Sequence, residues 1–407
     1  MRLTLKEKRK ATKITAARYQ KASKKHKGII LDEFMALTDY DRCYASYLLK
    51  NHGKKVRINN KTVVVGDISK RHKRQHQRTY GDDVLKSLKQ IWVIMDCICG
   101  KRLRPMLNEM LAILQKHKEI RVTREIKKKL LHISAATIDR LLKPERKKYE
   151  LKGRSLTKPG TLLKHQIPIR TFSEWDEQRP GFVEIDLVGH DGGDLRGDFI
   201  QTLNMTDVCT GWTEVQAVKN KAQIWVFEAL KDIRERLPFD LIGIDSDNGG
   251  EFINNHLFQF CQQEHITFTR ARSYRKNDNC FVEQKNYTIV RRYVGYGRYD
   301  TEAAQQLLNE LYGYLRLYAN FFHPVMKLIQ KTRIGSRVTK RYDVPQTPYQ
   351  RALASPSVPE IKKEILRQQY AQLNPAALRR KIANLQAKLF RFAESKEHHK
   401  KIQDNFV

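Results

Sequence analysis

From about residue 180 onward, short apolar runs alternate with apolar stripes at helical spacing. Residues 182–188 alternate apolar and polar side chains, which predicts a strand whose polar face carries Glu184 and Asp186. Further apolar runs predict strands over residues 199–207, 212–218, 241–245 and 266–271. Helical stripes predict helices over residues 226–237, 255–264 and 278–293. Three strands, a helix, a strand, a helix, a strand and a helix, in this order, predict an α/β core.

The residues before this core are predicted to be helical. Leu31–Leu37 and Arg42–Asn51 predict two short helices joined by a turn. Asp39 and Asp41 are expected to cap the second helix. The layout is that of a helix-turn-helix, and a simple helical hairpin fits the same pattern. Residues 1–27 contain eleven Lys or Arg and one acid, and form either a flexible basic arm or a polar helix.

A second helical region follows. Residues 83–117 carry apolar residues at helical spacing and are predicted to be helical. Val122–Leu131 and the segment after Ser134 then repeat the layout of a helix-turn-helix. Ser134 is expected to cap the later helix of this pair. We expect this second unit to read DNA, through Ser134, Thr137 and Arg140.

The residues after the core are basic and partly helical. Residues 301–319 predict a helix, which Asn320–Pro324 breaks. Lys327–Arg351 is basic and is a candidate to cross a DNA backbone, and Pro345 and Pro348 limit the regular structure expected there. Two heptads of apolar residues then predict a helix that packs on its own chain, because a coiled coil usually needs more. Their apolar positions are Leu378, Ile382, Leu385, Leu389 and Phe392.

These patterns divide the 407 residues into five parts. The parts are a basic arm with the first helix-turn-helix (1–80), a second helical DNA-binding domain (81–150), a linker (151–178), the α/β core (179–322) and a basic C-terminal extension (323–407). The expected fold is therefore multidomain, with all-α helix-turn-helix units before an α/β core and a basic, partly helical extension after it.

The charge is distributed unevenly along the chain. The formal net charge is +34 at pH 7. Residues 175–300 carry 15 Lys or Arg and 20 Asp or Glu, a net charge of −5, so that the flanks carry +39. Basic flanks around an acidic centre fit domains that bind a polynucleotide while the centre holds a metal. General solubility and RNA association remain as alternatives.

Three carboxylates of the core carry the candidate chemistry. Asp186 lies in the first strand, Asp247 follows the strand predicted over residues 241–245, and Glu283 lies in the last helix, after 35 intervening residues. A carboxylate in an apolar run is costly to bury unless it is paired or binds a metal. Converging carboxylates repel one another, so the pattern predicts one or two divalent cations, Mg²⁺ or Mn²⁺. Two ions about 4 Å apart suit an in-line phosphoryl displacement.

These residues resemble the DDE integrase/transposase superfamily, which includes retroviral integrases and bacterial insertion-sequence transposases. The family motif is an Asp on the first strand, an Asp in a Thr/Ser-Asp-Asn-Gly turn and, after 35 residues, a Glu with an Asn three positions further on. The matching residues, within about Pro180 to Asp300, are Asp186, Asp247, Glu283 and Asn286. The resemblance implies a ribonuclease-H-like core, in agreement with the order of elements predicted above.

The resemblance also implies an activity, that of a DNA transposase or integrase. Water would cleave a phosphodiester at the end of a mobile element, and the freed 3′-OH would attack target DNA. Asp186 would bridge two Mg²⁺ or Mn²⁺ ions, with Asp247 and Glu283 holding one each. The implied partners are double-stranded DNA, at the element ends and the target, and further copies of the chain in a synaptic complex.

Two other functions fit part of the pattern. One is a catalytically inactive DNA-binding regulator derived from a transposase, which the intact set of three carboxylates disfavours. The other is a ribonuclease-H-type nuclease, which cuts without joining. Two helix-turn-helix candidates before the core disfavour the nuclease, because cleavage of an RNA–DNA hybrid needs no sequence reader.

Several charged residues lie beside the motif. Glu184 and Asp245 share strand faces with the first two motif carboxylates and are competing ligands. The motif and its spacing select Asp247, so we expect both competitors to support the ligands or to be solvated. Candidate DNA contacts on the helix of the third carboxylate, for which a solvated face is the alternative, are Lys285, Asn286, Arg291 and Arg292.

Four His and Cys residues have the order of a zinc-binding set. His72, His76, Cys97 and Cys99 follow the order of a retroviral-integrase zinc domain. One residue between the two cysteines suits tetrahedral closure poorly, and a cysteine in an apolar helical run is often a small core residue, so zinc is disfavoured.

Six scattered cysteines indicate reduced thiols. With no run near the ~18 apolar residues of a membrane helix, the sequence predicts a cytoplasmic protein that acts on bacterial nucleoid DNA.

Overall fold

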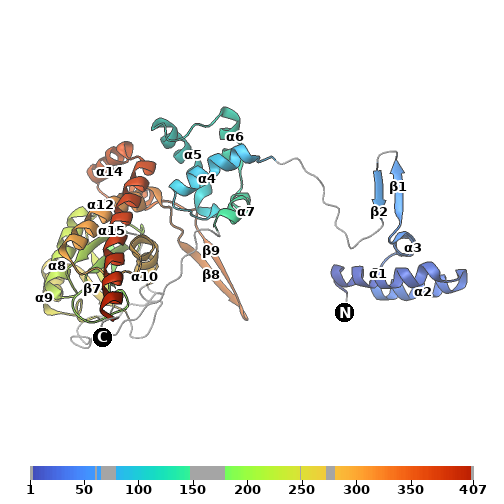
Figure 1. The fold of residues 1–407 in the computed structure, drawn as a ribbon, viewed down its shortest axis with the longest axis horizontal. Helices are drawn as coiled ribbons and strands as arrows, with labels where there is room; N and C mark the ends of the chain where they lie inside the picture. The colour runs from blue at the N-terminus through green and yellow to red at the C-terminus, as the bar shows by residue number, and fades with distance from the viewer. Residues whose placement is uncertain are drawn as a thin grey trace. The chain divides into compact units, whose positions relative to one another are not determined.

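The computed structural model describes residues 3–59, 62–65, 79–146, 179–247, 249–271 and 280–404. The chain forms two compact units, Met1–Arg78 and Thr79–Val407 (Figure 1). In the described residues, no helix is long and apolar enough to cross a membrane.

The first unit is a small helical bundle followed by a hairpin. Its elements are α1 (Leu5–Lys21), α2 (Lys24–Thr38), α3 (Arg42–Asn51), β1 (Lys55–Asn59) and β2 (Thr62–Val65). The segment predicted as an arm or a helix is therefore a helix, α1, and it packs on α2 and α3. Asp41 caps α3, as predicted, whereas Asp39 ends α2 in a left-handed conformation and does not cap α3. A core residue from each helix, Ala16, Phe34 and Leu49, is fully buried between them.

The second unit begins with four helices. They are α4 (Asp82–Ile94), α5 (Gly100–Lys116), α6 (Arg124–His132) and α7 (Ala135–Arg146). The helical structure predicted over residues 83–117 is interrupted, because Asp96 and Cys97 have φ of 53° and 58°. Cys97 and Cys99 thus lie in a turn, and not inside a helix as expected. Gly100 opens α5 where a Cβ would lie 2.2 Å from the Ala135 carbonyl oxygen, which lets α5 approach α7 closely.

A five-stranded sheet forms the centre of the second unit. Its strands are β3 (Phe182–Gly189), β4 (Gln201–Asp207), β5 (Thr213–Val218), β6 (Gly243–Ser246) and β7 (Thr267–Arg270). Their order across the sheet is β5-β4-β3-β6-β7. The first three strands along the chain pair antiparallel, whereas β6 and β7 join them in parallel. All five strands were predicted, and β6 and β7 are shorter than expected.

Helices cover the sheet between and after these strands. They are α8 (Gln223–Arg236), α9 (Asn255–Gln263), α10 (Cys280–Lys285), the π-helix η3 (Asn286–Arg291), α11 (Arg292–Val294) and α12 (Glu302–Phe322). The predicted order of three strands, helix, strand, helix, strand and helix is confirmed. The helix predicted over residues 278–293 changes to π geometry at Asn286, directly after α10. Because α10 packs on β3 and β4, its residues lie over the strand of Asp186.

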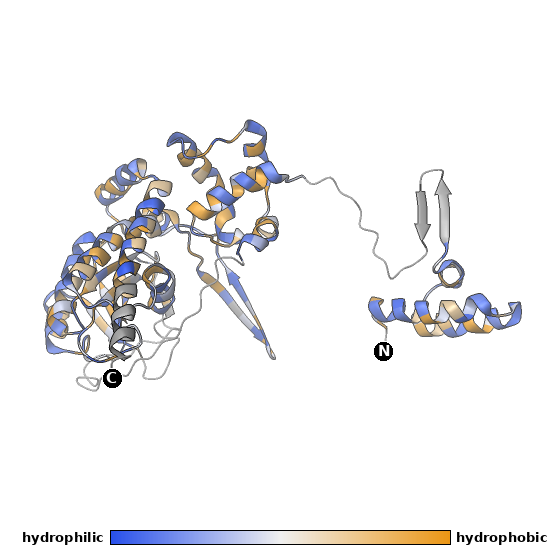
Figure 2. Cartoon of the chain, viewed as in Figure 1, coloured by the Kyte–Doolittle hydropathy of each residue, from blue (hydrophilic) through white to orange (hydrophobic). Residues whose placement is uncertain are grey.

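The C-terminal residues form a hairpin and three helices. These elements are β8 (Leu328–Ile334), β9 (Arg337–Tyr342), α13 (Pro348–Ala354), α14 (Glu360–Gln372) and α15 (Pro375–Asp404). The predicted C-terminal helix is α15, and it packs along α12. Two expectations were wrong: α12 continues through Asn320 to Phe322, and the stretch after Lys327 contains regular strands. Figure 2 shows hydrophobic and hydrophilic residues alternating along the helices, as expected where one face is buried.

Candidate active site

The sheet register brings Asp186 and Asp247 to adjacent positions. Asp186 lies within β3, and Asp247 directly follows β6. These two strands are parallel neighbours, and Ile185 pairs with Ser246 at the end of their ladder. The next residue along each chain is a motif carboxylate, so the two carboxylates lie at the same level of the sheet. Glu283 lies on α10, which packs on β3.

The Asp186 carboxylate is held by two hydrogen bonds. Its Oδ1 accepts from the Leu187 backbone N–H at 2.8 Å, and its Oδ2 accepts from Asn286 Nδ2 at 2.6 Å. Asn286 Oδ1 in turn accepts from Asn204 Nδ2 at 2.8 Å. Asn204 pairs with Asp186 across β3 and β4. The polar chain from β4 through η3 to β3 therefore fixes the orientation of the Asp186 carboxylate.

Burial raises the pKa values of both aspartates, and the charge of Asp247 also acts on Asp186. Burial, and next the charge of Asp247, raise the pKa of Asp186 to about 7, and the charge of Glu283 acts in the same direction. Burial also raises the pKa of Asp247, against a hydrogen bond from the Gly249 N–H that lowers it. That bond is 2.8 Å long and holds Oδ1 of the Asp247 carboxylate. The three motif carboxylates thus lie within one electrostatic environment.

Glu184 lies below this group and caps the start of α10. Its side chain is 0% exposed, and its Oε2 accepts from the Val282 backbone N–H at 2.8 Å. Burial raises the pKa of Glu184 well above its ordinary value, and the charges of Asp245 and Glu283 raise it further. Glu184 therefore ties β3 to the helix turn that carries Glu283.

Asp245 is equally buried and is directed away from solvent. It is 0% exposed and lies opposite Glu184 in the register of β3 and β6. The Thr269 hydroxyl of β7 donates a hydrogen bond to its Oδ1. Glu184 and Asp245 were expected either to support the ligands or to be solvated. Both are buried inside the sheet, and neither is solvated.

Glu283 is exposed on α10, and residues 272–279, which precede this helix in the sequence, lie outside the described part of the chain. Within the described residues, no group of three or more His, Cys, Asp or Glu side chains is arranged to hold a metal ion. The register of β3 and β6 brings Asp186 and Asp247 together, and the charge of Asp247 acts on Asp186. The role of all three carboxylates as metal ligands remains a prediction.

The predicted DNA contacts after Glu283 make bonds within the chain. Lys285 Nζ donates to the Gly211 carbonyl at 3.3 Å, and burial, then the Arg102 charge, lower its pKa to about 7. Arg291 donates to the Gly189 carbonyl at 2.7 Å, and Arg292 forms an ion pair with Asp96. Asn286 binds Asp186, as described above. The structure places these four side chains in the support of the core, and their contact with DNA stays a prediction.

The predicted DNA reader at α6 and α7 has an exposed polar start. Ser134 Oγ accepts from the Thr137 backbone N–H at 3.2 Å, as predicted for a capping residue. Arg140 donates to the Thr137 hydroxyl at 2.9 Å.

Two of the four candidate zinc ligands, His72 and His76, lie outside the described residues. Burial raises the pKa of the Cys97 thiol.

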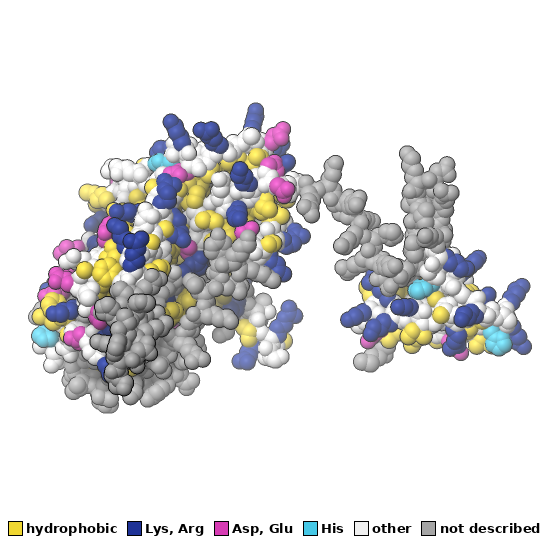
Figure 3. Space-filling model, in the orientation of Figure 1, with side chains coloured by type: hydrophobic (Ala, Val, Ile, Leu, Met, Phe, Trp, Pro, Cys, Tyr) yellow, Lys and Arg dark blue, Asp and Glu magenta, His cyan; other side chains and the backbone are white. Residues whose placement is uncertain are grey.

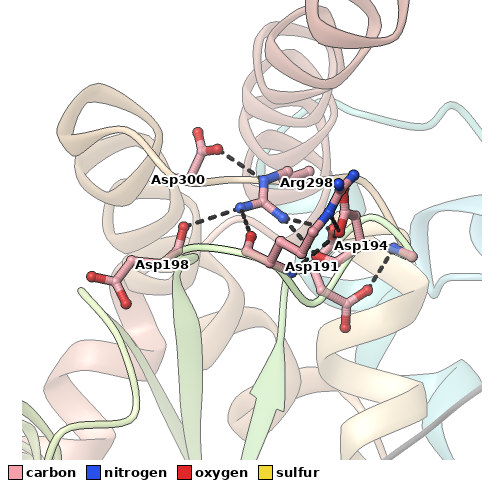
Figure 4. A network of polar contacts seen from close by, with 7 residues as sticks. Asp191, Asp194, Asp198, Arg298 and Asp300 are labelled. Carbon is pink, nitrogen blue, oxygen red and sulfur yellow. Dashed lines mark hydrogen bonds and ion pairs between the residues drawn. The ribbon is translucent and has the colours of Figure 1, made fainter. Parts of the chain in front are cut away.

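One arginine organises the connection between β3 and β4. Arg298 forms an isolated bridge with Asp191, two residues after β3 ends, and its Nε donates to Asp300 at 2.9 Å. Figure 4 shows the guanidinium enclosed by this loop. The other guanidinium donors reach four backbone carbonyls, those of Asp191, Asp194, Arg196 and Asp198. The Arg298 side chain, bound to these carbonyls, therefore fixes the loop that joins the strand of Asp186 to the strand of Asn204.

Sequence reasoning missed Asn204 and the capping role of Glu184. A signal for Asn204 was available, because Thr202, Asn204 and Thr206 alternate with apolar residues and define the polar face of β4. The hydrogen bond from Val282 to Glu184 joins residues 98 positions apart, and no local sequence pattern indicates it.

Comparison with known proteins gives one relative and several integrase cores. No family model matches the chain. The HTLV-2 integrase catalytic core domain in complex with magnesium, in its dimeric form, is 15% identical, covers 36% of this chain and 90% of its own, and gives a TM-score of 0.28. The catalytic core domain of BIV integrase is 17% identical, covers 47% and 98%, and gives a TM-score of 0.27.

The relative is a bacterial protein of nearly the same extent. Uncharacterized protein y4rM of Sinorhizobium fredii (strain NBRC 101917 / NGR234) is 39% identical over 334 residues, which cover 82% of this chain and 91% of that protein. The alignment thus spans most of both chains. The protein described here belongs to the same family as y4rM.

Proposed function

We propose that this protein is a DNA transposase or integrase that cleaves DNA at the ends of a mobile element and joins those ends to target DNA. The observation that carries the proposal is the placement of Asp186 and Asp247 at adjacent positions of neighbouring parallel strands, with the charge of Glu283 acting on Asp186. The same three residues have the order, local sequence and spacing of the DDE motif.

The donor set fits hard divalent cations. Asp186, Asp247 and Glu283 would hold one or two Mg²⁺ or Mn²⁺ ions, because carboxylate oxygens are the ligands that these ions prefer. Burial, and next the charges of Asp247 and Glu283, raise the pKa of Asp186, and a bound cation would offset both effects. When bound, the ions would offset the carboxylate charge and stabilise the attacking and leaving oxygens of a phosphoryl transfer.

The residues of the chain itself supply orientation. Asn286 and the Leu187 N–H hold the two oxygens of Asp186, and the Gly249 N–H holds Asp247. Glu184 fixes the first turn of α10 and thereby the direction of Glu283. Ligands placed by strands and helices, and supported by hydrogen bonds, keep the narrow geometry that catalysis requires.

The flanking parts would bind the DNA. The net charge of +39 outside residues 175–300 suits a polyanion. We propose the first unit and the α6–α7 pair as DNA-binding domains, with Ser134, Thr137 and Arg140 facing the duplex. Joining two element ends to one target calls for several copies of the chain in a synaptic complex, so we propose a homo-oligomer on double-stranded DNA.

An oligonucleotide assay separates the proposal from its alternatives. Duplexes that represent the ends of the host element are incubated with the full chain and Mg²⁺, and the products are resolved by length. A transposase yields 3′-end cleavage and longer, joined strands. A nuclease yields shorter strands alone, and a DNA-binding regulator yields a gel shift without either product; each of these two results would overturn the proposal.

A further inference from the structure

The β8–β9 hairpin is a two-stranded ribbon that stands away from the body of its unit (Figure 1). Every residue of β9 is exposed. Two apolar side chains of β8, Ile329 and Ile334, are 61% and 78% exposed. An isolated two-stranded ribbon is marginally stable in water. The ribbon therefore leaves in solvent apolar side chains that its own fold does not bury.

The base of the ribbon is fixed rigidly to the unit. The Lys327 N–H donates to Asp343 Oδ1 at 2.7 Å, and the Asp343 N–H donates to the Lys327 carbonyl at 3.0 Å. Arg351 of α13 donates to Asp343 Oδ2 at 2.6 Å and to the Val325 carbonyl at 3.2 Å. An isolated bridge joins Val325 to Gln346 below these contacts. The ribbon therefore has a defined direction although it buries little surface.

The ribbon is strongly cationic, and its sequence contains no acidic residue that would offset this charge. Residues 328–342 contain five Lys or Arg and no Asp or Glu. In the part of the chain that the structure describes, the exposed side chains of Arg333, Arg337 and Lys340 have no hydrogen-bond or ion-pair partner. The arginines that support the fold, such as Arg351, are by contrast paired. Figure 3 shows Lys and Arg side chains beside hydrophobic ones at the far end of the hairpin.

We propose that the β8–β9 hairpin lies in the major groove of duplex DNA, with its cations on the phosphates and Ile334 against the bases. The choice of DNA rests on the proposed function; the mode of binding rests on the ribbon. The major groove, about 12 Å wide, admits a two-stranded β-ribbon. A strand of seven residues is about 23 Å long at roughly 3.3 Å per residue, so cations along it reach several phosphates. Apolar side chains in that groove contact thymine methyl groups.

The electrostatic part is tested by the salt dependence of binding. In the full chain, Arg333→Gln, Arg337→Gln and Lys340→Gln are combined, and affinity for a mixed-sequence duplex is measured over a series of salt concentrations. The slope of log affinity against log salt should become shallower by about 2 to 3, because each lost phosphate contact removes about 0.9. A matched triple variant of exposed lysines, Lys231→Gln, Lys362→Gln and Lys388→Gln, should leave the slope within about 1 of the wild type.

Two further variants guard against a misfolded ribbon. Arg333→Lys with Arg337→Lys keeps the charge and should restore the wild-type slope. Ile334→Ser should weaken binding about three- to tenfold at every salt concentration without changing the slope, since it removes an apolar contact and no ion. Replacing thymine by uracil in the duplex should weaken binding of the wild type and leave the Ile334→Ser variant unaffected.

Specific outcomes would overturn the inference. If the charge-removing triple variant keeps the wild-type slope while the wild type binds and joins DNA, the ribbon does not contact DNA and the proposed function stands. If the triple variant instead changes the oligomeric state in sedimentation, the ribbon holds a second copy of the chain. If uracil leaves wild-type binding unchanged, Ile334 does not lie in the major groove. A wild-type chain that binds no duplex DNA would refute the proposed function as well.

Discussion

Removing the acceptor at Glu184 should slow strand transfer by releasing the first turn of α10. Glu184 Oε2 accepts the Val282 N–H at 2.8 Å, and Val282 directly precedes Glu283. The first amide groups of a helix have no partner within the helix, so the side-chain acceptor fixes where α10 begins. In Glu184→Leu this buried amide loses its partner, whereas Glu184→Gln keeps an acceptor oxygen in a side chain of nearly the same shape.

The expected effect follows from the cost of an unsatisfied buried donor. Such a group costs about 1 to 3 kcal/mol. If that free energy is lost in the positioning of Glu283, the rate falls by about 5- to 150-fold. Glu184→Gln should stay within about threefold of the wild type.

The assay is single-turnover joining of a pre-cleaved oligonucleotide end to target DNA, measured at several Mg²⁺ concentrations. Positioning of Glu283 predicts that Glu184→Leu needs more Mg²⁺ for half-maximal rate, while Glu184→Gln does not. Thermal unfolding of each variant separates this effect from general loss of structure. The reasoning is refuted if Glu184→Leu joins DNA at the wild-type rate, or if Glu184→Gln is as slow as Glu184→Leu although both variants remain folded.

Three further predictions concern the core and the flanks. Burial lowers the pKa of His190 to about 3, so the unfolded chain takes up a proton below pH 6.5 that the folded chain excludes. Between pH 7 and pH 5, the wild type should therefore lose about 2 kcal/mol more free energy of unfolding than His190→Gln, as measured by urea unfolding. Asn286→Ala should lower joining about 10- to 100-fold and leave DNA affinity unchanged, and lost affinity with a normal rate would favour a DNA contact instead. In gel shifts, residues 1–150 should bind DNA with a steep salt dependence and residues 175–300 weakly; equal affinity at the same salt would contradict this division.

The sheet and its helices were predictable because their pattern is local. In β3 the apolar residues alternate with Glu184 and Asp186, and this two-residue period defines a half-buried strand. Asp247 was placed correctly after a strand, since Gly249 and Gly250 announce a turn. The order of elements then followed from the order of the patterns.

The interruption between α4 and α5 was not predictable from the same signal. Apolar residues continue at helical spacing across it, and the turn depends on left-handed conformations at Asp96 and Cys97, which are not glycines. Tertiary contacts select these conformations: the Trp92 Nε1 donates to the Ile98 carbonyl, and the Gly100 N–H donates to Asp139 of α7.

The hairpin and the contacts that support the candidate active site escaped prediction for other reasons. Both faces of the β8–β9 ribbon are exposed, so its strands lack the alternation that burial imposes, and Pro345 falls after β9 has ended. The bonds from Asn286 to Asp186 and from Val282 to Glu184 span 100 and 98 residues. Only the three-dimensional fold brings such pairs together, so the sequence identified the motif carboxylates but not the contacts that orient them.

Comparing Asp247→Asn with Asp245→Asn in the joining assay under Mg²⁺ tests the central claim most directly. The two carboxylates are two residues apart, and one is expected to hold metal while the other is buried against the Thr269 hydroxyl. Asp247→Asn should bind DNA normally and show no joining. Asp245→Asn should keep measurable joining, because an amide oxygen still accepts from Thr269. An inactive Asp245→Asn beside an active Asp247→Asn would contradict the assignment of the site and the 35-residue spacing on which it rests.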